Sequence, residues 1–237
     1  YLAHPEEAAA IAARGQARTL RDHSHPIRMR QTGEVLARHL ARKNGIHRLP
    51  PQDLGRISYG HTPMLAHDIT PALEDSWRSE TIPHKQRALV ERELDDLYRG
   101  APPLVFRVLA EAIQPHIRPG LEVLEIGCAS GYYYEVLEYL LNTRLSYVGV
   151  DFSVAMIRLA RQYYPGVHFE VGDGSALRFN DRSIPIVVSS CVLLHVQQYA
   201  LHIAEAARVA SEIVIFHRTP VSRSTPTRHY KKYAYGV

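Results

Sequence analysis

Cysteine is scarce in this sequence: Cys128 and Cys191 are the two in 237 residues, and neither stands in a spacing typical of metal ligands. This argues against a disulfide framework, and we expect a reducing, cytoplasmic compartment. Long apolar runs are also lacking, since none approaches the roughly 20 residues that cross a membrane. The first residues contain no signal-peptide core. We therefore expect a soluble, intracellular protein without a membrane partner.

Clustered metal ligands are lacking as well. The fourteen histidines are scattered, and His23 and His25, which stand one residue apart, have no further ligand pattern near them. We therefore predict no metal site. What the chain does have is a hydrophobic content of 46%, which can fill a core at this length.

Charge is distributed unevenly along the chain. Residues 1–50 carry nine Lys and Arg against four Asp and Glu, residues 51–214 carry fourteen against twenty, and residues 215–237 carry five against none. Basic ends around an acidic middle could hold a phosphate-bearing partner, such as RNA or a nucleotide-linked sugar. Terminal basic segments are also commonly solvated or disordered, so both interpretations stay open.

The most informative stretch is Leu121–Gly131, which reads LEVLEIGCASG. An apolar run of strand formers stops at Gly127, and a pattern with helical spacing begins at Tyr132. This predicts a strand, a glycine turn and a helix. Gly127 and Gly131 allow a tight turn and the close approach of a ligand, and amide groups at the helix start can bind a negatively charged group. We expect a nucleotide-like ligand.

Two nucleotide-binding patterns can be distinguished at this turn. A dinucleotide-binding G-x-G-x-x-G would need glycines where Ala129 and Tyr132 stand. The residues present, Glu125-x-Gly127-x-x-x-Gly131, resemble instead the first motif of class I S-adenosylmethionine-dependent methyltransferases. The middle position, often glycine in that family, is Ala129 here. The resemblance implies S-adenosylmethionine as the cofactor.

The next two predicted strands end in acids. Asp151 closes the apolar segment YVGVDFS, and Asp173 follows HFEVG. By resemblance to the family, Asp151 would hold the ribose, Phe152 would pack on the adenine and Asp173 would meet the adenine amino group. For any one of these acids a helix N-cap is the alternative role. The cofactor-binding residues implied are Glu125, Gly127, Cys128, Ala129, Gly131, Asp151, Phe152, Asp173, Gly174, Cys191 and Val192.

The segment Ser189–Val196 resembles the family's fourth motif, where the backbone of Cys191 and Val192 would meet the methionine part of the cofactor. His195 would then face the transferred methyl group, and its unperturbed pKa near 6.5 suits a general base. In many relatives a histidine here only shapes the pocket, so both roles stay open. Cys128 and Cys191 would end neighbouring strands, and bound cofactor is expected to shield both reduced thiols.

A helical stretch precedes this domain. Pro83 suits the start of a helix and Gly100 its end. Trp77, the only tryptophan, and Arg78 lie just before it, and either could face the pocket. A lone tryptophan is more often a core residue.

The predicted fold is α/β, a doubly wound and mostly parallel sheet, and the resemblance to the family implies the strand order 3-2-1-4-5. Residues 1–100 would form a helical N-terminal extension with an irregular connection at 49–72, and residues 101–237 a Rossmann-like methyltransferase domain. The nineteen residues after Arg218 are too few and too polar for the helix and the antiparallel strands that the family normally adds. The C-terminal edge strands are therefore missing from the prediction, and a second copy of the chain or a parent multidomain protein would complete the sheet.

The predicted function is transfer of a methyl group to a small hydroxylated metabolite or saccharide. The acceptor pocket would be lined by Tyr59, His61, His195 and Tyr230, the last in a basic tail at 228–235 that either covers the pocket or frays. Nucleic acid is not the expected partner, because no aromatic and basic pattern of a known RNA-binding module is present. An RNA methyltransferase, and a non-catalytic methyltransferase-like scaffold module of a larger assembly, are the alternatives.

Overall fold

The computed structural model describes residues 6–7, 9–14, 60–70, 75–219 and 229–233. The chain divides into two compact units, residues 1–47 and residues 48–237. In the first unit the described residues are helical and exposed, as expected for the N-terminal extension. Tyr59 and the neighbouring part of the expected irregular connection lie outside the described residues.

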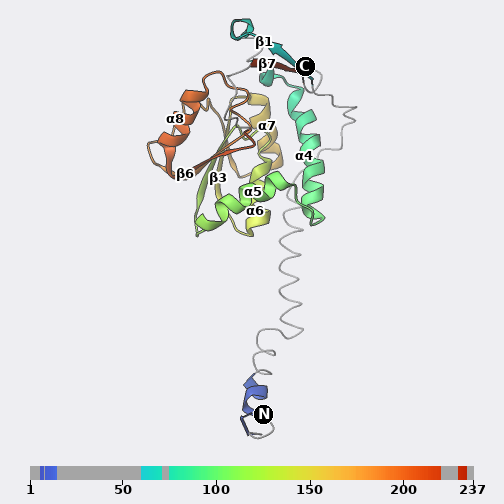
Figure 1. Cartoon of the computed structure of the whole chain (residues 1–237), viewed down its shortest axis with the longest axis vertical. Coiled ribbons are helices and arrows are strands. Elements are labelled where there is room, and N and C mark those ends of the chain that lie inside the picture. Colours follow the sequence, from blue (N-terminus) through green and yellow to red (C-terminus); the bar gives the residue numbers. More distant parts are fainter. Residues whose placement is uncertain (1–5, 8, 15–59, 71–74, 220–228, 234–237) are drawn as a thin grey trace. The chain divides into compact units, whose positions relative to one another are not determined.

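A five-stranded parallel sheet forms the centre of the second unit (Figure 1). Its strands lie in the order β4-β3-β2-β5-β6, which confirms the predicted order 3-2-1-4-5. The register places Ile126 of β2 between Val150 of β3 and Ser189 of β5. The strands are β2 (Glu122–Ile126), β3 (Ser146–Asp151), β4 (His168–Val171), β5 (Ile184–Ser190) and β6 (Ala210–His217).

Helices cover both faces of this sheet, as expected for strands that alternate with helices along the chain. Figure 1 shows α8 on one side of the sheet and α4, α5, α6 and α7 on the other. Among the described residues of this unit, three short 3-10 helices lie in the connections. The helices are η1 (Ala66–Asp68), η2 (Asp75–Arg78), α4 (Ile82–Tyr98), α5 (Leu104–Ile113), η3 (Gln114–His116), α6 (Tyr132–Leu141), α7 (Val154–Tyr163) and α8 (Tyr199–Val209).

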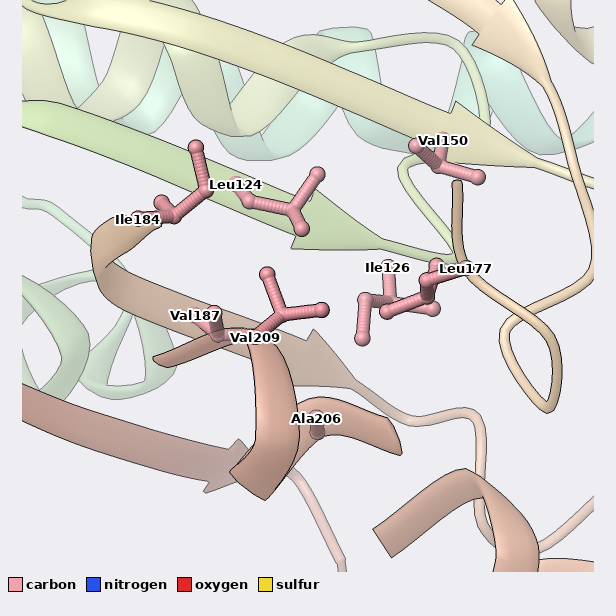
Figure 2. Packing of buried hydrophobic residues seen from close by; sticks show 8 residues of the cluster. All are labelled: Leu124, Ile126, Val150, Leu177, Ile184, Val187, Ala206 and Val209. Carbon is pink, nitrogen blue, oxygen red and sulfur yellow. The ribbon is translucent and has the colours of Figure 1, made fainter. Parts of the chain in front are cut away.

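Side chains of the strands alternate between two buried layers. In β2, Leu124 and Ile126 belong to the layer under α8, while Val123 and Glu125 belong to the opposite face. Apolar residues fill the first layer, whereas the second contains the buried carboxyl of Glu125 and the hydroxyl of Tyr147. The layer under α8 consists of Leu124, Ile126, Val150, Leu177, Ile184, Val187, Ala206 and Val209 (Figure 2).

Helix α4 is held against α7 by a buried arginine. Pro83 lies in the first turn of α4, and Gly100 follows its end with a φ of +84°, so both predicted helix signals are confirmed. The guanidinium of Arg87 lies 3.8 Å from the ring centroid of Tyr163 and donates a hydrogen bond to the Tyr164 hydroxyl at 2.9 Å. This contact joins the helical stretch to the sheet domain.

A second, two-stranded antiparallel sheet joins segments that are distant in the sequence. Strand β1 (Gly60–Met64) pairs with β7 (His229–Tyr233). The expected irregular connection is therefore wrong for residues 60–64, because the strand that completes their hydrogen bonds lies near the far end of the chain and no local pattern reveals it. Residues 229–233 of the basic tail form a paired strand and not a frayed end.

Candidate active site

One side chain ties together the carboxyl ends of β2 and β3. Asp151, the last residue of β3, accepts a hydrogen bond from the Ala129 amide at Oδ2 and another from the Ser153 amide at Oδ1, both at 2.9 Å. Ala129 lies in the turn between β2 and α6. Asp151 thus holds this turn in place. Its two oxygens keep further acceptor capacity, because a carboxylate offers about four lone-pair sites.

The alternative role of Asp151, a helix N-cap, is not the one found. Helix α7 is capped by Ser153, whose hydroxyl accepts a hydrogen bond from the Met156 amide at 3.4 Å. Burial raises the pKa of Asp151 to about 6, against the lowering effect of its two amide hydrogen bonds. Further hydrogen-bond donors would favour the ionised carboxylate, and the two hydroxyls of a ribose are donors of this kind.

The glycines of the turn serve close packing. Gly127 and Gly131 have φ values of 73° and 75°, which favour glycine. A Cβ on Gly127 would lie 2.2 Å from Cγ2 of Val192, and one on Gly131 would lie 2.5 Å from the ring of Phe169. The Gly127 amide donates to a β3 carbonyl at 2.7 Å, and the Gly131 amide donates within the turn at 2.8 Å. These two amides are therefore not free donors for a negatively charged ligand.

Two of the expected cofactor residues, Glu125 and Cys128, have side chains buried beneath the carboxyl ends of the strands. Glu125 is 2% exposed and accepts a hydrogen bond from the Tyr147 hydroxyl, and burial raises its pKa to about 8. Cys128 is 1% exposed, its sulfur lies against Gly149, and burial raises its pKa as well. Both side chains support the turn from the protein interior.

Left-handed backbone at residues other than glycine gathers at the carboxyl ends of the strands. Three of the five described residues of this kind lie there: Ala129 after β2, Cys191 after β5 and Arg218 after β6, with φ values of 49°, 60° and 54°. Such conformations are costly, and they cluster at functional sites. The Cys191 amide donates to the His217 carbonyl at 2.8 Å and so joins the ends of β5 and β6. This strained backbone marks the carboxyl ends of the strands as the candidate site.

The short helix η2 contacts two of the expected site residues. The rings of Trp77 and His195 have centroids 5.0 Å apart, and the guanidinium of Arg78 lies 5.3 Å from the ring centroid of Phe152. Trp77 is half-buried, so it is both a packing residue and a neighbour of His195. No spacing in the sequence distinguishes these two roles. Trp77 packs against an apolar cluster that consists of Ile82, Ala129 and Met156.

Asp173 and Gly174 lie on the segment that follows β4. Asp173 is exposed, and its Oδ1 accepts a hydrogen bond from the Ser175 amide at 2.8 Å, which orders a turn and not a helix start. A Cβ on Gly174 would lie 2.6 Å from Nδ1 of His202. Sequence reasoning missed His202, because a single histidine in an amphipathic helix has no distinguishing spacing.

The expected acceptor residues fall into two groups. His195 lies in the segment that follows β5, and its amide donates a hydrogen bond to the Val192 carbonyl at 2.8 Å. His61 of β1 and Tyr230 of β7 belong to the small sheet. The pairing of these strands brings together two segments that were predicted to line the acceptor pocket. Tyr230 is 48% exposed. Tyr59 lies outside the described residues.

The residues at this edge fit S-adenosylmethionine in their chemistry. Asp151 has acceptor capacity left for a ribose, and Phe152 offers a half-buried ring for an adenine. The Ser130 hydroxyl, in the turn itself, is buried without a hydrogen-bond partner among the described residues. Over the same residues, no group of three or more His, Cys, Asp or Glu side chains is placed to hold a metal ion. Nor does the described part of the chain contain a helix long and apolar enough to cross a membrane.

Comparison with known families agrees with this geometry. Residues 124–213 match the family model described as methyltransferase domain. That stretch runs from β2 into β6 and contains Asp151, Asp173 and His195. Over these residues the chain is similar to the methyltransferase domain family, and its parallel sheet is Rossmann-like.

Curated relatives match the chain over part of their length. A protein of Mycolicibacterium smegmatis, named a probable S-adenosylmethionine-dependent methyltransferase, is 30% identical over 94 residues, which cover 40% of this chain and 35% of the relative. The demethylmenaquinone methyltransferase of Renibacterium salmoninarum is 32% identical over 91 residues, or 38% of this chain and 37% of the relative. The chain thus spans little more than a third of the length of these two relatives.

Solved structures of methyltransferases also resemble the chain. An S-adenosylmethionine-dependent methyltransferase of Methanosarcina mazei is 28% identical, with a TM-score of 0.37, over 42% of this chain and 51% of that chain. A chain in the complex of the Haloferax volcanii Trm112 methyltransferase activator is 23% identical, with a TM-score of 0.45, over 57% of this chain and 55% of that chain.

Proposed function

We propose that the chain is an S-adenosylmethionine-dependent methyltransferase whose acceptor is a small hydroxylated metabolite or saccharide. The observation that carries the proposal is the position of Asp151, which ends β3 and binds the Ala129 amide of the glycine turn. This is the acid, and the turn, that the family resemblance assigns to the cofactor. S-adenosylmethionine would supply a sulfonium-activated methyl group, so the chain needs mainly to align the acceptor and exclude water.

The cofactor would lie across the carboxyl ends of the strands. Asp151 would accept hydrogen bonds from the ribose hydroxyls, Phe152 would pack on the adenine, and Asp173 would accept a hydrogen bond from the adenine amino group. The backbone at Cys191 and Val192 would face the methionine part. The left-handed backbone at Cys191, joined to the end of β6, supports a site at this point of the edge.

His195 is the proposed proton acceptor. Bound S-adenosylmethionine would supply the methyl group to the acceptor oxygen, and the imidazole of His195 would take up the proton of the acceptor hydroxyl. The contact between His195 and Trp77 supports this role, because the indole shields one side of the imidazole from water. An acceptor held here would meet a proton acceptor in a partly dry environment.

Two observations support a small-molecule acceptor. One relative is named for demethylmenaquinone, which is a small molecule. In this chain the small β1–β7 sheet carries an exposed tyrosine, Tyr230, whose flat ring suits packing on a sugar or an aromatic acceptor. These features support a small-molecule acceptor, and its identity requires a screen.

Calorimetric titration with S-adenosylhomocysteine tests the cofactor site. The unmodified chain should bind, and Asp151→Ala should weaken binding by about 1.5 to 3 kcal/mol, the range for hydrogen bonds to a charged group. Asp96→Ala, which removes an exposed carboxylate of α4 paired with Arg99, is the matched control and should bind normally. Equal binding by Asp151→Ala would refute the assigned site.

A second measurement separates an enzyme from a scaffold. Cell extracts are incubated with the chain and methyl-tritiated S-adenosylmethionine, and labelled small molecules and RNA are collected separately. We expect label in the small-molecule fraction. Label in RNA would support the alternative substrate, and cofactor binding without any transfer would support a non-catalytic module.

A further inference from the structure

One face of α8 holds the segment that follows β4. Glu205 and Arg208 are three positions apart and so lie on the same side of the helix. Glu205 accepts a hydrogen bond from the Leu177 amide at 2.8 Å, and Arg208 donates to the carbonyls of Leu177 at 3.1 Å and Phe179 at 2.8 Å. Arg208 also bonds both oxygens of Glu205. The far end of the segment is thereby fixed to the helix.

His202 continues this face by one further step of three residues. Its Nε2 lies 2.9 Å from the Ser189 hydroxyl of β5, and the two residues are 1% and 0% exposed. On the other side, a Cβ on Gly174 would lie 2.6 Å from Nδ1 of the ring. The imidazole therefore fills the space between a central strand and the residue that follows Asp173.

Burial favours the neutral form of the His202 ring. Burial lowers the pKa of His202, with the Asp173 carboxylate acting in the opposite direction. The first turn of α8 also disfavours a cation, because the helix dipole is positive there. A neutral imidazole has one donor and one acceptor nitrogen, which suits a fixed contact with a hydroxyl. In its neutral form His202 offers the Asp173 carboxylate no positive charge to pair with.

We infer that His202 is a positioning residue for cofactor selectivity: held by Ser189, it sets the place of Gly174 and so aims Asp173 at the adenine amino group. The inference rests on the proposed function, in which Asp173 accepts a hydrogen bond from that group. His202 touches neither the methyl group nor the acceptor in this scheme. Its effect is on which purine the site prefers.

The test compares two ligands by calorimetry: S-adenosylhomocysteine and S-inosylhomocysteine, which has a carbonyl oxygen in place of the amino group. A carboxylate accepts a hydrogen bond from the first and repels the second, so the unmodified chain should prefer the adenosyl ligand by about tenfold or more. His202→Phe keeps a flat ring without nitrogen atoms, and Ser189→Ala removes the hydroxyl that holds it. Each should lower the preference by about threefold or more.

Two further variants separate positioning from loss of stability. His202→Gln can keep a hydrogen bond to Ser189, and it should recover part of the preference. Val209→Ala removes apolar contacts of the same helix, and it should lower the unfolding midpoint without changing the preference. Stability of every variant is measured in parallel.

Each outcome has a defined meaning. If the unmodified chain binds neither ligand, the proposed function and this inference both fail. If it prefers the adenosyl ligand and both His202→Phe and Ser189→Ala keep that preference, the inference alone is overturned. It is also overturned if the unmodified chain binds both ligands equally, or if Val209→Ala loses the preference as fully as His202→Phe. Should His202→Phe fail to fold, Ser189→Ala decides.

Discussion

The rings of Trp77 and His195 meet edge to face, with centroids 5.0 Å apart and planes inclined by 66°. The next residue, Arg78, lies over the ring of Phe152 at 5.3 Å. Two adjacent residues of η2 thus contact two side chains that the proposal assigns to the adenine and to the transferred methyl group of the cofactor. A ligand that extends from Phe152 to His195 would lie beneath η2.

The first prediction concerns His195. The substitution His195→Phe keeps a flat ring beside Trp77 but removes both nitrogens. If His195 accepts the proton, kcat should fall by about 100-fold or more, because positioned general bases contribute roughly 10²–10⁴. Affinity for S-adenosylhomocysteine should stay within about threefold. Tyr199→Phe, at an exposed position of α8, is the control. An unchanged kcat would show that His195 only shapes the pocket.

The two cysteines should differ in reactivity. Cys191 is half-buried, whereas Cys128 is 1% exposed and burial raises the pKa of its thiol. We expect a thiol reagent to modify Cys191 in the folded chain and Cys128 only after unfolding, because the thiolate is the reactive form. S-adenosylhomocysteine should slow labelling at Cys191, and Cys191→Ser should abolish native labelling. Rapid labelling at Cys128 would contradict the packing described, and shielding of both thiols by the cofactor is no longer expected.

Stability should depend on pH through Glu125. Burial raises its pKa from the ordinary 4.5 to about 8, so the folded state holds a proton there that the unfolded state releases above pH 4.5. The stability from this proton is complete below pH 4.5 and is lost as pH rises through about 8. Relative to Glu125→Gln, the unmodified chain should lose a few kcal/mol of unfolding free energy between pH 5 and 8.

Urea denaturation at three pH values measures this difference. Asp151 also has a raised pKa and is present in both proteins, so the comparison isolates Glu125 together with its electrostatic interaction with Asp151. Glu122→Gln, at the exposed first position of β2, should follow the unmodified chain at every pH. Parallel stability curves for Glu125→Gln and the unmodified chain would mean that the carboxyl is ionised in the folded state.

The fourth prediction concerns Arg87, which is 2% exposed and has an ion pair with Glu135 at 3.9 Å as well as the contacts with Tyr163 and Tyr164. Arg87→Met should lower the unfolding free energy by about 3 to 5 kcal/mol, because it leaves a buried carboxylate without its cation. Arg92→Met, at an exposed position of the same helix, should change it little. Adding Glu135→Gln to Arg87→Met should recover part of the loss. A small effect of Arg87→Met on the unfolding free energy would mean that the contacts of Arg87 contribute little to holding α4 against the domain.

The parallel sheet was predictable from strands that alternate with helices along the chain, and its order was predicted from the resemblance to the family. The place of Asp151 followed in the same way, since it ends an apolar run and so comes to the carboxyl edge. Glu125 was different. A charged residue at the end of a predicted strand suggested a contact with the ligand. The neighbours of Glu125, Tyr147 and Cys128, come from other parts of the sheet and the turn, and only the packed structure shows that the carboxyl is buried.

The β1–β7 pairing and the contacts of η2 could not be predicted from local patterns. Residues 60–64 contain a proline and few strand formers, and their pairing depends on hydrogen bonds from residues 229–233. The face of α8 formed by His202, Glu205 and Arg208 looks in the sequence like an ordinary polar stripe. Its partners Gly174 and Leu177 lie about 28 positions earlier, and backbone amides and carbonyls leave no trace in a residue pattern.

The pairing of β1 with β7 also affects the order in which the domain can assemble during synthesis. The two strands are about 165 positions apart, so at about 5–20 residues per second the ribosome completes β7 roughly 8 to 33 seconds after β1. All five strands of the large sheet emerge in that interval. The parallel sheet can therefore form before β1 has its partner, and the small sheet is the last to close on the nascent chain.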